Sequence, residues 1–248
     1  MENIGIISFY GLLFGIIGTS FGGFIGAFFK VSSNKYLSFT LEFAAGLMTS
    51  IICFDLIPES LEIIDITPCI LGILSGILTM IFCNKIVTLY SINSTNFNNK
   101  KHSSLFQTGI IIALGLAIHN FPEGLAIGAG FETSNTLGLK LAIAIALHDI
   151  PEGISIALPL RLSGSSKTKS IVITTISGLT TGLGAFFGVL IGNISPVFIG
   201  LSLSFAAGCM LYILSCELIP ESKKRYSGRL GSLGFMLGLI SGLLTKAL

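Results

Sequence analysis

Eight apolar stretches separated by short polar intervals run through the chain, and this pattern constrains the fold more than any other feature. They lie near 4–29, 36–58, 66–83, 105–130, 137–160, 170–192, 196–219 and 230–248. A bilayer core needs ~20 apolar residues per helix, so the stretches match eight membrane spans. Only 10% of residues are charged, against about a quarter in soluble domains. We therefore predict an all-α integral membrane protein with eight transmembrane helices and exclude a soluble globular protein.

Basic residues are distributed unevenly between alternate loops. With the N-terminus outside, two lie on the outer side, Lys140 and Lys246, and twelve face the cytoplasm. This asymmetry follows the positive-inside rule, so we expect a multi-pass protein of the plasma membrane (a bacterial-type cell membrane) with both termini outside. No basic stripe with interleaved aromatics is present, which excludes nucleic-acid binding. The twelve are Lys30, Lys35, Lys85, Lys100, Lys101, Arg161, Lys167, Lys169, Lys223, Lys224, Arg225 and Arg229.

One segment of 18 residues occurs twice. FAAGLMTSIICFDLIPES at 43–60 recurs as FAAGCMLYILSCELIPES at 205–222, with 11 of 18 positions identical and no gap. The same shift of 162 residues aligns the first apolar stretch with the sixth and the third with the eighth. Five spans separate the two starts, so the copies must be inverted relative to each other. Inverted repeats are typical of secondary transporters, whose substrate sites lie near the membrane midplane.

The repeat also predicts how the chain is organised. We expect a single transmembrane transporter domain over 1–248, with repeat one at 4–83, central helices at 105–160 and repeat two at 170–248. This is a 3+2+3 inverted-repeat bundle. The interval 84–104 is rich in Asn and Ser, a composition typical of a flexible connection, and we expect it in the cytoplasm.

The two central stretches carry related motifs, HNFPEG at 119–124 and HDIPEG at 148–153. A charged residue at the bilayer centre costs about 2.5–3.5 kcal/mol, so the three carboxylates in these motifs need a compensating partner. His and Glu at i and i+4 share a helix face, and two antiparallel helices could assemble their ligands around one divalent cation. One motif alone could be a proline kink, but two aligned copies argue for a metal site. The candidate ligands are His119, Asn120, Glu123, His148, Asp149 and Glu152.

Mixed imidazole and carboxylate ligands suit zinc, iron(II), manganese or cobalt better than calcium or magnesium. Met48 lies near the middle of its span and could contribute a soft thioether, although Met more often fills a core. The repeated segments add one acidic pair toward each membrane face, for capture outside and release inside; the alternative is that the helix-end acids are simply solvated. These pairs are Asp55 with Glu59 and Glu217 with Glu221.

With these residues in place, the sequence resembles the ZIP (zinc/iron-regulated-transporter-like) metal transporters, especially the bacterial and organellar branch with short loops. The resemblance covers nearly the whole chain and implies an eight-helix bundle that moves divalent metal into the cytoplasm. It also implies that the six motif residues form the metal centre, with Met48 contributing and with Glu123 and Glu152 bridging two adjacent sites. The family often has a carboxylate in a span-six stretch like SGLAEP; here SGLTTG at 177–182 places Thr181 there, which argues against the second site.

We therefore predict a transporter of zinc, with iron, manganese, cobalt and cadmium as further candidates, that works by alternating access. The expected partners are divalent metal ions and the lipid bilayer; a homodimer is compatible with the sequence, which does not define the oligomeric state. No prosthetic group is expected, and no enzymatic activity. The alternatives are a metal-gated channel and an intramembrane metalloenzyme, the latter weakened by the absence of His-Glu-x-x-His.

Overall fold

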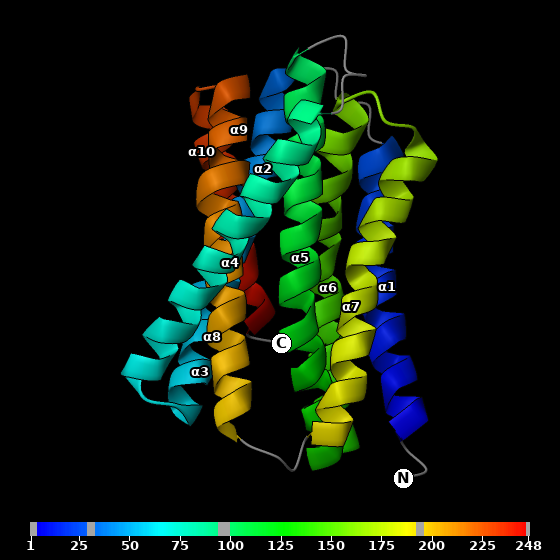
Figure 1. The fold of residues 1–248 in the computed structure, drawn as a ribbon, viewed down its shortest axis with the longest axis vertical. Helices are drawn as coiled ribbons and strands as arrows, with labels where there is room; N and C mark the ends of the chain where they lie inside the picture. The colour runs from blue at the N-terminus through cyan, green and yellow to red at the C-terminus, as the bar shows by residue number, and fades with distance from the viewer. Residues whose placement is uncertain (1–3, 29–32, 94–99, 192–195, 247–248) are drawn as a thin grey trace.

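The computed structural model describes residues 4–28, 33–93, 100–191 and 196–246 (Figure 1). Within these ranges the secondary structure is helical, with no strand. Two π-helical turns, η1 and η2, interrupt otherwise continuous helices. The elements are α1 (Ile4–Phe28), α2 (Asn34–Ile51), η1 (Ile52–Leu56), α3 (Ile57–Ile63), α4 (Ile66–Asn93), α5 (Lys100–Thr133), α6 (Asn135–Leu162), α7 (Lys167–Ile191), α8 (Pro196–Tyr212), η2 (Ile213–Leu218), α9 (Ile219–Arg225) and α10 (Arg229–Lys246).

Seven helical segments in the described ranges are long and apolar enough to cross a membrane. They cover 5–28, 34–63, 66–89, 104–131, 138–162, 167–190 and 197–225, and a shorter apolar helical segment covers 229–244. The protein is therefore an all-helical, multi-pass membrane protein. All eight predicted apolar stretches are helical over their described residues.

The predicted flexible connection at 84–104 needs correction at both ends. Helix α4 continues to Asn93 and α5 begins at Lys100, so most of this polar interval is helical; 94–99 lie outside the described residues. Side-chain hydrogen bonds are present along the extension of α4. The Thr88 hydroxyl donates to Asn84 Oδ1 at 3.1 Å. Gln107 Nε2 of α5 donates to the Thr88 hydroxyl at 2.5 Å.

The helices form two groups that lie side by side (Figure 1). We call α1, α5, α6 and α7 the motif bundle, because α5 and α6 carry the two polar motifs and all four helices pack against one another. The flanking group pairs α2 with α10 and α4 with α8. Helix α8 also packs against α5 and so joins the two groups.

Glycines related by the repeat make equivalent close contacts. A Cβ on Gly76 would meet the backbone of Phe205 in α8, and one on its repeat mate Gly238 would meet the backbone of Phe43 in α2. Close helix packing through small residues is characteristic of membrane bundles. The pairing of α4 with α8 is therefore repeated, residue for residue, by that of α10 with α2.

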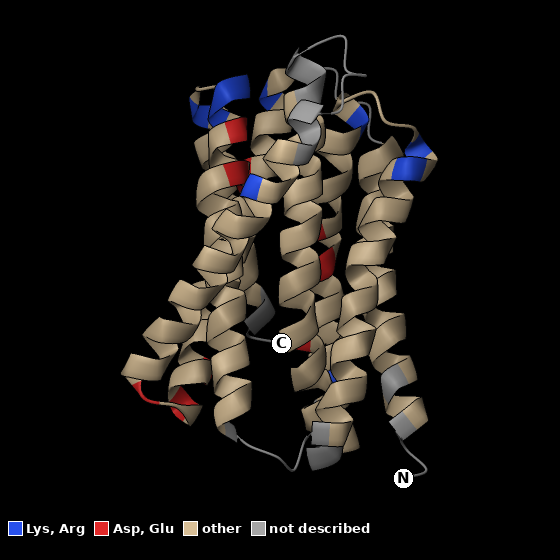
Figure 2. Cartoon of the chain, in the orientation of Figure 1, with Lys and Arg blue, Asp and Glu red and all other residues tan. Residues whose placement is uncertain are grey.

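Charged residues concentrate at the two ends of the molecule and in its middle (Figure 2). Lys and Arg gather at the end away from the N-terminus, which we call the basic end. The starts of α2 and α7 and the end of α9 carry Lys35, Lys167, Lys169, Lys223 and Arg225. At the basic end, α6 ends at Leu162, and Gly164, two residues further on, has a φ of 91°, a left-handed conformation that favours glycine.

Candidate metal centre

The two predicted motifs face each other where α5 packs against α6. His148 Nε2 of α6 lies 3.1 Å from Glu123 Oε1 of α5. In the opposite sense, His119 Nε2 of α5 lies 3.5 Å from Glu152 Oε2 of α6 and 3.6 Å from Glu123 Oε1. Each histidine thus approaches a carboxylate of the other helix. The structure therefore brings together the His and Glu side chains of both motifs.

The spacing of these atoms fits coordination of a common ion. Zinc binds imidazole nitrogen and carboxylate oxygen at about 2.0–2.2 Å in a tetrahedral arrangement, which places neighbouring ligand atoms roughly 3.3–3.6 Å apart. Asp149 Oδ1 lies 3.9 Å from His148 Nε2. Ligand atoms of Glu123, His148 and Asp149 all lie within 4.8 Å of one another, so small side-chain movements could close them on one ion.

Burial makes this arrangement costly without a cation. His119, Asn120, Asp149 and Glu152 are fully buried, and Glu123 is 3% exposed. Buried polar groups are normally hydrogen-bonded, and an unpaired buried charge is more costly still. In the described part of the chain, the following buried motif atoms have no hydrogen-bond partner: His119 Nδ1 and Nε2, Asn120 Oδ1, Glu123 Oε2, both Asp149 oxygens and both Glu152 oxygens.

Helix α7 contributes polar groups beside the centre. Asn120 Nδ2 donates to the carbonyl oxygen of Ser177 at 3.2 Å, a contact that the sequence analysis missed because it joins residues 57 positions apart. One turn further, Thr181 is fully buried, and its hydroxyl has no hydrogen-bond partner among the described residues. A Cβ on Gly15 of α1 would lie 2.8 Å from that hydroxyl oxygen, so the Thr181 hydroxyl faces α1.

The glycine that ends each motif allows the neighbouring helices to approach. A Cβ on Gly124 would collide with the backbone of Thr181 in α7, and one on Gly153 with the backbone of Thr19 in α1. The motif bundle can thus close tightly around the polar side chains. This packing explains why both motifs end in glycine.

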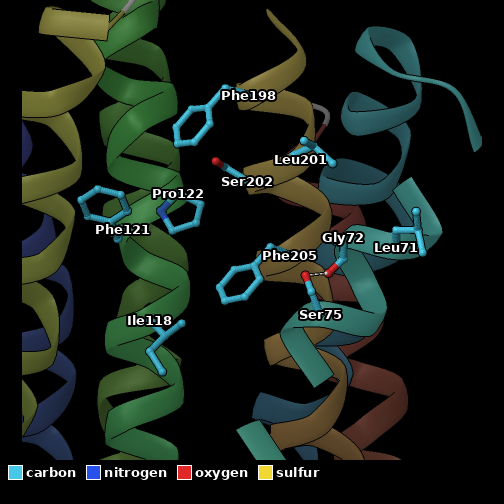
Figure 3. Close-up of a pocket in the computed structure, with 10 residues that line it drawn as sticks. All are labelled: Leu71, Gly72, Ser75, Ile118, Phe121, Pro122, Phe198, Leu201, Ser202 and Phe205. Atoms are coloured by element: carbon cyan, nitrogen blue, oxygen red, sulfur yellow. Dashed lines mark hydrogen bonds between the residues drawn. The ribbon is translucent and has the colours of Figure 1, made fainter. Parts of the chain in front are cut away.

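The other side of α5 faces an apolar pocket of about 600 Å³ between the motif bundle and the flanking group. Figure 3 shows Ile118 and Pro122 of α5 opposite Phe198 and Phe205 of α8. Helix α5 continues through Pro122. Since His119 and Glu123 point toward α6, the motif separates a polar face from an apolar one.

A second cavity, of about 430 Å³, leads to the centre from the end opposite the basic end. We call it the acidic cavity, because Asp55 of η1 and Glu59 of α3 line it together with Glu123 and His148. The side chain of His148 is 13% exposed, whereas that of His119 is fully buried. The structure therefore joins the first predicted acidic pair to the motif centre, and the centre is approached from this side.

The second acidic pair lies toward the basic end and is enclosed. Glu217 of η2 is 8% exposed and accepts a hydrogen bond at 3.2 Å from Asn84 Nδ2 of α4. Asn84 also donates to the Tyr212 hydroxyl at 2.5 Å, and Thr108 of α5 hydrogen-bonds Glu217. These contacts join α4, α5 and η2, and the sequence analysis did not predict them.

Glu221 is buried rather than solvated, so the alternative reading of this helix-end acid as a solvated boundary residue is wrong. Arg225 Nε donates to Glu221 Oε1 at 2.7 Å, and Lys224 Nζ lies 3.7 Å from Oε2. Nearby, Lys223 Nζ lies 2.8 Å from Glu42 Oε1. Glu221 and Glu42 are therefore held in ion pairs.

Met48 is fully buried in the largest hydrophobic cluster, which includes Ile112 and Leu116 of α5. Those residues lie on the helix that carries His119. Met48 acts here as a packing residue, and its role as a metal ligand stays a prediction.

Comparison with known proteins identifies the family to which the chain is similar. Residues 94–245 match the family described as "ZIP Zinc transporter". The chain is 30% identical over its whole length to Zinc transporter ZupT of Chlorobium chlorochromatii, of which it covers 97%. It is 33% identical to Zinc transporter ZupT of Escherichia coli O127:H6 over 89% of this chain and 88% of that protein.

A third relative, Zinc transporter GufA of Myxococcus xanthus, is 40% identical over 139 residues, which is 56% of this chain and 55% of that protein. These named relatives are transporters rather than enzymes. The match to the family over most of the chain, together with full-length similarity to ZupT, shows that this multi-pass membrane protein belongs to the ZIP family of zinc transporters.

Proposed function

We propose that this protein carries zinc into the cytoplasm by alternating access, with His119, Asn120, Glu123, His148, Asp149 and Glu152 as the metal centre. The observation that carries the proposal is the convergence of buried imidazole and carboxylate groups, several of whose ligand atoms lack hydrogen-bond partners. A doubly charged ion would compensate these groups. The names of the relatives favour zinc, and the ligand chemistry also suits iron(II), manganese, cobalt and cadmium.

The proposed architecture is a single domain of eight membrane helices in a 3+2+3 inverted repeat, with both termini outside the plasma membrane. The repeat-related glycine contacts of α4 with α8 and α10 with α2 support the inverted repeat. The basic end supports the orientation, because Lys and Arg concentrate on cytoplasmic loops.

In this mechanism, metal passes Asp55 and Glu59, binds the centre and leaves past Glu217 and Glu221. The acidic cavity supports the first half of the path, since it contains both Asp55 and the motif residue Glu123. The hydrogen bonds of Glu217 close the second half in this conformation. Release requires the motif bundle to move relative to the flanking group. Met48 would approach the metal during that movement.

The test is zinc uptake into proteoliposomes by the full-length protein and by two variants, Glu123→Ala and His148→Ala. We expect both to abolish saturable uptake, because each removes a ligand of the centre. Glu62→Ala, which removes a carboxylate of α3 that is exposed and outside the acidic cavity, is the matched control and should transport normally. Thermal unfolding in detergent monitors folding of each variant. Full uptake by Glu123→Ala and His148→Ala would reject the centre.

A further inference from the structure

Lys140 stands out because it is a basic residue in the wall of the acidic cavity. It lies near the start of α6, its side chain is exposed, and it lines the cavity with Asp55 and Glu59. An ammonium group has no lone pair, so Lys140 cannot be a metal ligand. Its effect on a passing cation must be electrostatic.

The charges around the cavity come from elements of both helix groups. Asp55 and Glu59 belong to η1 and α3, which continue α2 of the flanking group, while Lys140, Glu123 and His148 belong to the motif bundle. We call the part of the cavity lined by Asp55, Glu59 and Lys140 its mouth. The mouth therefore carries two carboxylates and one ammonium. A dication feels each fixed charge twice as strongly as a monovalent ion does, so removing the ammonium should favour divalent ions most.

Lys140 and the metal centre lie at different heights along α6. Lys140 precedes His148 by eight residues, which is about 12 Å along a helix. The Debye length is about 10 Å at 0.1 M salt, so Lys140 acts more strongly on the mouth than on the centre. Its removal should change capture much more than the later steps of transport.

We propose that Lys140 is a specificity-determining residue, whose ammonium weakens the capture of divalent cations at the mouth of the acidic cavity. Conduction through a series of sites needs binding that is strong enough for ions to enter and weak enough for them to leave. Two carboxylates alone would hold a dication firmly. The ammonium reduces that hold and so raises the zinc concentration at which the cavity captures a metal ion.

The transport test rests on the proposed function and compares Lys140→Gln with the charge-conserving Lys140→Arg. At low ionic strength we expect Lys140→Gln to lower the KM for zinc roughly three- to tenfold, with Vmax within about twofold of wild type. Lys140→Arg should keep the wild-type KM. Lys85→Gln removes an exposed lysine from α4, outside this cavity, and should also leave KM unchanged. In ~0.5 M salt the effect should shrink below about twofold.

A second measurement does not depend on transport. Ala144 lines the same cavity one turn beyond Lys140, and Ala144→Cys, in a background with Cys53, Cys83 and Cys216 replaced by Ser, reports the local potential. We expect Lys140→Gln to raise the ratio of labelling rates for cationic over anionic methanethiosulfonates by roughly tenfold. Lys140→Arg should leave the ratio unchanged.

The two readouts distinguish failure of this inference from failure of the proposed function. An unchanged labelling ratio in Lys140→Gln, or an equal shift in Lys140→Arg, overturns the role of Lys140. If the wild-type protein takes up no zinc, the proposed function fails, and the labelling ratio still decides whether Lys140 sets the potential of the cavity.

Discussion

The two copies of the repeated segment share a π-helical turn but end differently. In both, a proline follows a π-helical turn: the Ile57 amide donates to the carbonyl of Ile52, five residues back, and the Ile219 amide donates to that of Leu214. Both copies then read IPES. The first continues with Leu61, Glu62 and Ile63 and the second with Lys223, Lys224 and Arg225.

This difference decides what each acid does. Glu221 of the second copy is buried against Arg225, while Glu59 of the first copy lines the acidic cavity. The shared π-helical turn and proline place an acid near each end of the path. The residues after the proline give Glu221 an ion-pair partner, Arg225, in its own helix, whereas the first copy has Ile63 at the corresponding position. An inverted repeat can thus build two ends with different charge.

The largest effect should come from breaking the ion pair of the second copy. The side chains of Arg225 and Glu221 are 7% and 6% exposed, and removing one partner of a buried pair costs about 3–5 kcal/mol. We expect Arg225→Ala to lower the free energy of unfolding by about 3 kcal/mol, measured by denaturation in mixed micelles.

Lys224→Ala is the control, because its side chain is 60% exposed and an exposed pair contributes at most about 1 kcal/mol. Equal losses for Arg225→Ala and Lys224→Ala would contradict the comparison. Replacing both Arg225 and Glu221 by Leu should recover most of the stability, because no buried charge is left unpaired.

Much of this comparison was accessible from the sequence. The apolar stretches, the repeat and the motif spacing are local patterns, so they predicted the helices and the pairing of His119 and Glu123 with His148 and Glu152. The ion pair of Glu221 with Arg225 has i, i+4 spacing, a recognised helix signal that was read only as part of a basic loop.

Other contacts could not be predicted because they depend on how distant helices are rotated against each other. Asn84 and Glu217 are 133 residues apart, and no periodicity links them. Lys140 was expected on the outer side, but its place in the wall of the acidic cavity depends on where α6 lies relative to η1 and α3 across that cavity. The polar residues at 84–93 predicted a flexible connection, but α4 continues through them to Asn93.

A smaller effect should follow from transferring the basic residue of the second copy to the first. Ile63 occupies the position that corresponds to Arg225, four residues after Glu59. Ile63→Arg should place a guanidinium near Glu59 and raise the KM for zinc about three- to tenfold, since it opposes cation capture. Ile63→Gln is the neutral control. If both variants show the same KM in proteoliposome uptake, charge at this position does not control capture.

The smallest effect should come from the hydrogen bonds that enclose Glu217. Tyr212→Phe removes the hydroxyl that accepts from Asn84, and one such bond contributes about 0.5–1.5 kcal/mol. We expect a loss of about 1 kcal/mol in the free energy of unfolding, because Asn84 keeps its contact with Glu217. Tyr36→Phe, at a position 61% exposed, should be neutral. A loss in Tyr212→Phe as large as that in Arg225→Ala would mean that the second copy is held closed by this polar network rather than by its ion pair.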